Sequence, residues 1–265
     1  MEYTDILFDV RDRTATITVN RPDRLNAFTR RTYYELTDAI RRAGWDRDVG
    51  VIVLTGAGTR AFGIGGDKDE KKADRVDNGI GILGNGIEEL QTAIRDVPKP
   101  VIAKVRGYAV GSGNVLVTLC DLAIAAENAE FGQVGPKMGS VDPGFGTAFL
   151  ARTVGEKRAR EFWYLCRRYS AREALAMGLI NAVVANDQLD GEVDKWCREI
   201  NDRSPTAIAI AKRSFNADSE NIRGIGQLAF SALALYFGTD EAKEGGNALR
   251  EKRKPDFAGN MYRGS

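Results

Sequence analysis

The pattern that most constrains the fold is a series of strand-like runs separated by turns and helical spacing. Residues 14–20 alternate polar and apolar side chains with period two, whereas residues 49–55 form a continuous β-branched run. Alternation is typical of a half-buried strand, and a continuous run is typical of a strand covered on both faces. Further strand patterns cover residues 101–105 and 121–126. Helical spacing covers residues 29–43, 87–96 and 114–119, which lie between the strands. We therefore expect a core of α/β class.

The rest of the chain differs from this core. After Phe145 strand patterns nearly vanish, and helical spacing takes over. Ser170, Ser204 and Thr239 are good helix-capping residues that precede three of these segments. The predicted helices cover residues 147–153, 156–168, 171–177, 187–202, 205–217, 224–237 and 240–253. A strand–helix core is thus expected to be followed by a helical remainder.

The 265 residues include no histidine, which limits the chemistry available to the chain. Mechanisms that need an imidazole base and metal sites with histidine ligands are excluded. The three cysteines, Cys120, Cys166 and Cys197, form no CxxC pair, so we expect reduced thiols and no metal site. Any reaction must use carboxylates, hydroxyls, lysines or backbone amides.

The charge balance argues against two classes of partner. Lys and Arg number 38 and Asp and Glu 37, a net charge of +1, so neither nucleic acid nor a membrane surface is expected as a partner. The first residues carry no export signal, and no uncharged run is long enough to cross a bilayer. We therefore expect a cytoplasmic protein.

Two glycine clusters each follow a strand pattern and precede a helix. The first is AFGIGGD at residues 61–67, and the second is GYAVGSG at residues 107–113. Glycines let the backbone approach a ligand, and a helix N-terminus offers unpaired N–H groups. Side by side, the two loops would aim two amides at one oxygen, forming an oxyanion hole that needs no histidine. Taken singly, each cluster is also explained as an ordinary tight turn. Gly56-Ala-Gly58 follows a strand pattern, but its spacing to the next glycines does not fit GxGxxG, and the chain has no GK(S/T) motif, so no nucleotide cofactor is expected.

A third glycine-rich cluster, at residues 131–146, holds Ser140 and Asp142 ahead of a predicted helix. A carboxylate at this place is either a general base or a helix cap and turn former. Between the first cluster and the next helix, residues 67–78 are highly charged, and we expect a mobile loop there, a candidate lid.

Together with NRPDRLNA at residues 20–27, KPVIA at 99–103 and CDLAIA at 120–125, these clusters resemble the crotonase (enoyl-CoA hydratase/isomerase) superfamily. The resemblance covers about residues 5–257. It implies a crotonase-type ββα spiral core with the acyl-CoA site over residues 1–200, and a C-terminal helical trimerisation region over residues 201–265. It further implies homotrimers or hexamers built as dimers of trimers. CoA would be part of the substrate, so no separate cofactor is expected.

The resemblance also assigns site residues. The amides of Gly66 and Ser112 would bind the thioester oxygen of an acyl-CoA substrate. The family usually has glycine at the second place, and a serine amide serves equally if its φ is negative. The expected CoA-binding residues are Arg24, Ala27, Gly65, Asp67, Lys68 and Lys252.

Departures from the family pattern reduce the number of reactions that the resemblance implies. The two glutamates of the hydratases are replaced by Val115 and Gly135, neither of which can hold a proton, so simple enoyl-CoA hydration is not expected. The stretch GQVGPKMGSVDPG at residues 132–144 resembles two ring-processing branches: 1,4-dihydroxy-2-naphthoyl-CoA synthases, which close a ring, and 2-ketocyclohexanecarboxyl-CoA hydrolases, which open one. The amino-acid sequence of this stretch is more similar to that of the hydrolases than to that of the synthases. Val134 stands where bicarbonate-using synthases have a hydroxyl, and a family tyrosine is replaced by Phe237, with Tyr236 one residue earlier.

We therefore expect a hydrolase that opens a cyclic β-oxoacyl-CoA, with Asp142 as the base and Ser140 and Tyr236 as further catalytic candidates. A useful base must be buried enough for its pKa to rise, so Asp142 should lie in a largely apolar pocket near Phe145 or Trp163. The alternatives are naphthoyl-type ring closure, decarboxylation, thioester hydrolysis or dehalogenation at the same aspartate, and a non-catalytic CoA-binding role.

Overall fold

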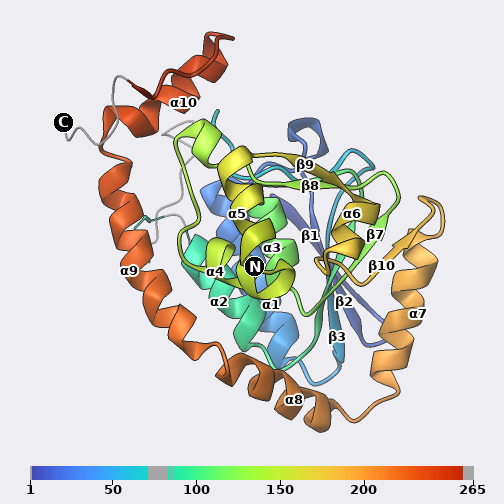
Figure 1. The fold of residues 1–265 in the computed structure, drawn as a ribbon. Coiled ribbons are helices and arrows are strands. Elements are labelled where there is room, and N and C mark those ends of the chain that lie inside the picture. The colour runs from blue at the N-terminus through green and yellow to red at the C-terminus, as the bar shows by residue number, and fades with distance from the viewer. Residues whose placement is uncertain (1, 71–82, 85, 259–265) are drawn as a thin grey trace.

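The computed structural model describes residues 2–70, 83–84 and 86–258 as two sheets surrounded by helices (Figure 1). The larger sheet has the order β1-β2-β3-β5-β7-β10. Within it β1 and β2 are antiparallel, and the remaining neighbours are parallel. Its strands are β1 (Ile6–Arg11), β2 (Thr14–Val19), β3 (Val51–Gly56), β5 (Val101–Val105), β7 (Leu122–Ala126) and β10 (Ala182–Val184).

The burial of these strands follows their sequence patterns. In β2 the apolar side chains of Ala15, Ile17 and Val19 are buried and the threonines between them are partly exposed. In β3 every residue from 51 to 55 is buried, as expected for a strand covered on both faces. The predicted α/β class is confirmed.

The smaller sheet determines where the loops that follow its strands lie. Its strands are β4 (Ala61–Gly63), β6 (Tyr108–Val110), β8 (Glu130–Gly132) and β9 (Arg168–Ser170), in that order. Because β4, β6 and β8 are parallel neighbours, their carboxyl ends meet at one edge. The three glycine clusters of the sequence continue from these ends, and the sheet therefore brings them together.

Helices cover the larger sheet on both faces. Side chains of α1 to α5 share one apolar core with it, whereas Leu189, Val193 and Cys197 of α7 cover the opposite face of β3, β5 and β7. The helices are α1 (Arg30–Trp45), α2 (Ile87–Asp96), α3 (Ser112–Leu119), α4 (Phe145–Val154), α5 (Glu156–Leu165), α6 (Ala171–Ala176), α7 (Leu189–Asn201), α8 (Pro205–Ala217), α9 (Glu220–Tyr236) and α10 (Asp240–Arg250), with short 3-10 turns η1 (Pro22–Arg24) and η3 (Pro136–Met138).

The helices α8, α9 and α10 run as an arc along one edge of the molecule (Figure 1, orange to red). α8 is held to the core by Lys212, whose buried ammonium donates to the Ile94 and Lys99 carbonyls and pairs with Asp121. α10 packs directly on η3, where Gly139 and Gly245 leave no room for a side chain. The C-terminal helices therefore reach back to the third glycine cluster.

The expectation of almost no strands after residue 145 is wrong in two places. β9 and β10 lie there, and each is three residues long. Such short strands leave no periodic pattern, and β9 is specified by its antiparallel pairing with β8. Among the described residues, no helix has the length and apolar character that a membrane span needs.

Candidate active site

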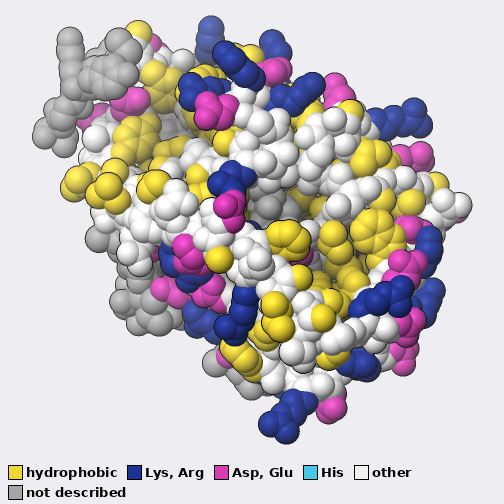
Figure 2. All heavy atoms as spheres, turned by 60° about the horizontal axis from the view of Figure 1, so that its bottom comes forward, with side chains coloured by type: hydrophobic (Ala, Val, Ile, Leu, Met, Phe, Trp, Pro, Cys, Tyr) yellow, Lys and Arg dark blue, Asp and Glu magenta, His cyan; other side chains and the backbone are white. Residues whose placement is uncertain are grey.

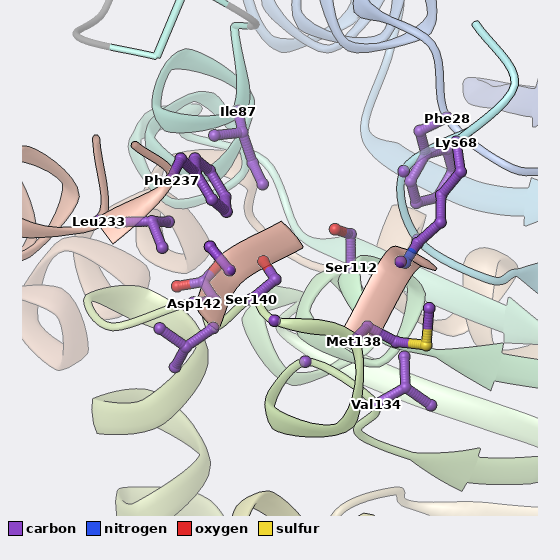
Figure 3. Close-up of a pocket in the computed structure, with 18 of the residues that line it drawn as sticks. Phe28, Lys68, Ile87, Ser112, Val134, Met138, Ser140, Asp142, Leu233 and Phe237 are labelled. Atoms are coloured by element: carbon purple, nitrogen blue, oxygen red, sulfur yellow. The ribbon is translucent and has the colours of Figure 1, made fainter. Parts of the chain in front are cut away.

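A cavity of about 870 Å³ lies where the loops after β4, β6 and β8 meet (Figure 3). The first loop contributes Gly65 and Gly66, and the second contributes Gly111 and Ser112. The third contributes a longer stretch that includes Asp142. Side chains from α9 and α10 complete the wall.

The first two loops touch each other through their backbones. Gly65 has φ +93° and Gly111 has φ +57°, the left-handed region that favours glycine. A Cβ built on Gly65 would lie 3.4 Å from the Ser112 nitrogen, an ordinary van der Waals contact, so the two loops lie close together and it is the positive φ that favours glycine. Hydrogen bonds from the Phe28 amide to the Gly65 carbonyl, 2.9 Å, and from the Asp67 amide to the Phe28 carbonyl, 2.7 Å, hold the first loop.

The structure brings the two predicted amides to the wall of this cavity. Ser112 is the first residue of α3, where an N–H has no acceptor within the helix. Its φ is not positive, as the serine substitution requires. Among the described residues, the N–H groups of Gly66 and Ser112 donate no hydrogen bond, so both are available to a ligand.

Asp142 lies in the same cavity and is only 7% exposed. Its Oδ1 accepts a hydrogen bond from the Gly146 amide at 2.7 Å, and its Oδ2 accepts one from Gln91 Nε2 at 2.5 Å. Burial raises the pKa of Asp142, and this effect exceeds the opposing effect of those hydrogen bonds. Trp163 lines the cavity too, and its Nε1 donates to the Gly146 carbonyl at 3.2 Å. The predicted burial of Asp142 near Trp163 is confirmed.

Ser140 also lines the cavity, and its amide donates to the Gly135 carbonyl at 2.8 Å. Gly135 itself has no space for a side chain. A Cβ there would lie 2.6 Å from the Ser140 carbonyl oxygen and 3.1 Å from the Trp163 ring. The loop is therefore shaped around glycine, and a hydratase-type glutamate at this position does not fit without a backbone shift.

Two polar side chains of the site were not predicted from the sequence. Gln91 of α2 is fully buried and donates to Asp142. Tyr33 of α1 is buried, and its hydroxyl donates to Ser112 Oγ at 3.2 Å. Burial raises the pKa of Tyr33 to about 12, so it remains a neutral donor. A polar residue on the apolar face of an amphipathic helix is the signal that points to such positions.

Gln133 is a further polar residue that lines the cavity. It is 1% exposed, and both of its side-chain amide atoms lack a partner among the described residues. A buried, unpaired amide is costly, so it is suited to bind a polar group that the cavity receives.

The expected CoA-binding residues are only partly brought together. Gly65, Asp67 and Lys68 line the cavity, whereas Arg24, Ala27 and Lys252 do not. Arg24 is engaged with the carboxylates of Asp67, at 3.1 Å, and Asp69, at 2.5 Å. The Ala27 carbonyl accepts a hydrogen bond from Arg21, and Lys252 is exposed beyond the end of α10. These three assignments therefore lack geometric support.

Cations that were not predicted from the sequence also line the cavity, and one of them is Arg30 of α1. Lys243 and Arg250 of α10 line the cavity together with Lys68. Burial and, after it, the positive charge of Arg250 lower the pKa of Lys68. Like charges held together in this way favour an anionic ligand.

Leu233 of α9 and Phe237, the residue that follows this helix, close another side of the cavity (Figure 3). Tyr236 does not line the cavity of its own chain, so its catalytic assignment stays a prediction. Of the charged loop predicted over residues 67–78, the part from residue 71 on lies outside the described residues. Among the described residues, no group of three His, Cys, Asp or Glu side chains is arranged to hold a metal ion.

Comparisons with known proteins agree with this geometry. The sequence model of the enoyl-CoA hydratase/isomerase family matches residues 10–260. An enoyl-CoA hydratase from Mycobacterium avium subsp. paratuberculosis is 32% identical, with a TM-score of 0.86 over 97% of this chain and 100% of that one. An enoyl-CoA hydratase/isomerase from Pseudoalteromonas atlantica is 26% identical, with a TM-score of 0.87 over 96% and 100%. A carnitinyl-CoA hydratase from Mycobacterium avium is 28% identical, with a TM-score of 0.85 over 96% and 98%.

These likenesses span nearly the whole chain and confirm the expected crotonase-type fold. They do not distinguish the ring-processing branches. The chain belongs to the enoyl-CoA hydratase/isomerase (crotonase) family, whose members generally act on CoA thioesters.

Proposed function

We propose that the protein is a hydrolase that opens the ring of a cyclic β-oxoacyl-CoA, such as 2-ketocyclohexanecarboxyl-CoA, by a reverse Dieckmann reaction. The observation that carries this proposal is a buried carboxylate, Asp142, in one cavity with the free amides of Gly66 and Ser112. Relatives named as hydratases share the fold, but here Val115 and Gly135 replace the hydratase glutamates, and position 135 has no room for one. Neither hydratase glutamate position can therefore supply a base, and Asp142 is the base that we propose.

The two amides stabilise the charge that ring cleavage creates. Breaking the bond between the α-carbon and the ring ketone leaves an electron pair that delocalises onto the thioester oxygen as an enolate. The N–H groups of Gly66 and Ser112 would donate to that oxygen, and one such preorganised donor is typically worth about 2.7–4 kcal/mol. Lys68, Lys243 and Arg250 would bind the phosphates of CoA at the charged side of the cavity.

Asp142 would supply the base. Its carboxylate takes a proton from water, and the resulting hydroxide adds to the ring ketone carbon. The tetrahedral alkoxide collapses to a carboxylic acid, the carbon–carbon bond breaks, and the enolate receives the proton from Asp142 at its α-carbon. The net change is the addition of one water, with the thioester intact. Burial of Asp142 suits this role, because a raised pKa strengthens the base.

A second candidate is ring closure of the naphthoyl-CoA synthase type. The observation that favours it is Gln133, whose buried amide is unpaired among the described residues and is suited to a polar or carboxylate-like group. The same Asp142 would then remove a proton from the substrate. Val134, which has no hydroxyl, lies beside Gln133 and makes the second candidate the weaker one.

We also propose that the chain assembles as a homotrimer or as a dimer of trimers through its C-terminal helices. Figure 2, which turns the side of α8 toward the viewer, shows hydrophobic side chains gathered in patches on this face. The exposed apolar residues of α8, α9 and the segment beyond them are Ile210, Phe215, Ile225, Leu228, Leu235, Phe237 and Leu249. Large exposed apolar side chains on adjacent helices are typical of interfaces.

Incubation with 2-oxocyclohexanecarboxyl-CoA, followed by mass spectrometry, tests the proposed function. Ring opening adds the mass of one water and retains CoA, whereas release of free CoA identifies a thioesterase. Absence of reaction with this compound, together with cyclisation of succinylbenzoyl-CoA, supports the synthase candidate instead. An Asp142→Asn variant is the matched control and should lose nearly all turnover while still binding acyl-CoA.

A further inference from the structure

The hydroxyl groups of Ser112 and Tyr33 form a pair that the two-amide oxyanion hole does not need. The amide of Ser112 would serve equally well if the residue were glycine, as the family pattern has it. Yet a hydroxyl is present, it faces the cavity, and Tyr33 donates a hydrogen bond to it at 3.2 Å. Figure 3 shows Ser112 between the Asp142–Ser140 side of the cavity and Lys68.

The Ser112–Tyr33 pair has one hydrogen-bond donor that its internal bond does not use. Two hydroxyls carry two donor protons, and the bond between them uses one. Within the described part of the chain, neither oxygen makes a further hydrogen bond. One donor proton is therefore free at the cavity wall, whichever of the two hydroxyls is the internal donor. Tyr33 comes from α1 and is 5% exposed, so the pair is held by the core and is not a surface feature.

We propose that the Ser112–Tyr33 pair is a third hydrogen-bond donor beside the two amides, and that it binds the β-oxygen of a β-oxoacyl thioester. This inference rests on the proposed function and names the feature of the substrate that the site selects. Ser112 Oγ lies three bonds from its own amide nitrogen, so a group bound there lies next to the thioester oxygen. In a β-oxo thioester the two carbonyl groups are separated by one carbon, and their oxygens can point in the same direction. The two oxygens can then accept from the Ser112 amide and from the adjacent hydroxyl pair.

The chemistry also benefits from a donor at this place. When hydroxide adds to the ring ketone, the β-oxygen becomes an alkoxide, and a donor that faces it stabilises the developing charge. The Tyr33 hydroxyl polarises Ser112 by donating to it, which strengthens the outward hydrogen bond. An acyl-CoA without a β-oxygen would leave this donor unpaired and bind less well.

The experiment compares the binding of two linear thioesters, acetoacetyl-CoA and butyryl-CoA, by isothermal titration calorimetry on the full chain. They differ in the β-oxygen, and one hydrogen bond predicts a preference for acetoacetyl-CoA of up to about tenfold. Ser112→Ala should bring this preference close to one, and Tyr33→Phe should reduce it part of the way. Tyr34→Phe is the matched control, because that hydroxyl bonds the Gly84 carbonyl outside the cavity, and the preference should persist.

Different results would overturn the role of the hydroxyl pair and the proposed ring opening. If the wild-type protein shows no preference, or if Ser112→Ala retains it, the inference is overturned even when ring opening is observed. A preference that collapses only in Ser140→Ala also overturns it, because the β-oxygen would then lie at Ser140. If the preference depends on Ser112 and Tyr33 but 2-oxocyclohexanecarboxyl-CoA is not opened, the hydroxyl pair stands and the proposed function fails.

Discussion

Gln91 should control the ionisation of Asp142, and its replacement should move the pH dependence of the reaction. In the folded protein Gln91 Nε2 donates to Asp142 Oδ2 at 2.5 Å, and both residues are buried. A donor to a carboxylate stabilises the charged form and lowers its pKa. Gln91→Leu removes the donor at similar volume, so the pKa of Asp142 should rise further.

The size of the shift follows from the energy of such a bond. A hydrogen bond to a charged group contributes about 1.5–3 kcal/mol, and one pKa unit corresponds to about 1.4 kcal/mol. The pKa of Asp142 should therefore rise by about one to two units. Because the ionised form is the base, the acidic limb of kcat/KM should move to higher pH by that amount. At pH values above the shifted limb, activity should recover.

The assay is ring opening of 2-oxocyclohexanecarboxyl-CoA, measured as kcat/KM from pH 5 to pH 9 for the wild type and the variant. Thr92→Ala, on the same helix and without a bond to Asp142, is the control and should leave the limb in place. Gln91→Leu removes Oε1, which has no partner among the described residues, but leaves Asp142 Oδ2 without its donor, so circular dichroism checks the fold of the variant first. An unchanged acidic limb in a folded Gln91→Leu protein would refute the reasoning.

Three further predictions concern stability and substrate binding. Asp142→Asn should raise the free energy of unfolding at pH 8, with a difference that shrinks toward pH 4. A carboxyl whose folded pKa is raised favours the folded state while protonated and loses that contribution as pH rises; denaturant titrations at both pH values check this. Gly135→Ala should destabilise the protein by about 1–3 kcal/mol in denaturant titrations, because its Cβ would meet the Ser140 carbonyl and the Trp163 ring; a neutral result contradicts the packing described. Arg250→Ala should raise KM for the acyl-CoA several-fold, more at low salt than at high salt, whereas Lys157→Ala, at an exposed position on α5, should not; equal effects would contradict a specific anion site.

The long elements of the fold were predictable because their patterns are local. Residues 87–96 and 101–105 match α2 and β5 residue for residue, since each has a clear period or apolar run bounded by prolines. The three-residue strands β4, β6 and β8 were not predictable, because three residues show no period. Their place is set by pairing with one another, which only the tertiary structure provides.

The residues of the candidate site also differ in how far the sequence alone predicts them. Gly66, Ser112 and Asp142 could be identified because they lie in glycine-rich loops whose composition has a chemical reason. Gln91 and Tyr33 each lie on the apolar face of a helix, which is a signal in the sequence, but their partners cannot be predicted because the contacts span 51 and 79 positions of the chain.

The charged residues were the least predictable part. Arg24 and Lys252 were expected at the CoA, but the docking of α10 on η3 brings Lys243 and Arg250 to the cavity instead. A surface cation has no local signature of the cavity that it will face.

The central claim is that water attacks a ring ketone while the thioester remains intact, and oxygen labelling tests it most directly. The wild-type protein is incubated with 2-oxocyclohexanecarboxyl-CoA in H₂¹⁸O, and the product is examined by tandem mass spectrometry. The account predicts a ring-opened acyl-CoA with one ¹⁸O in the new terminal carboxylate and none beyond background exchange in the thioester. Label in a free β-oxo acid, with release of CoA, would contradict it.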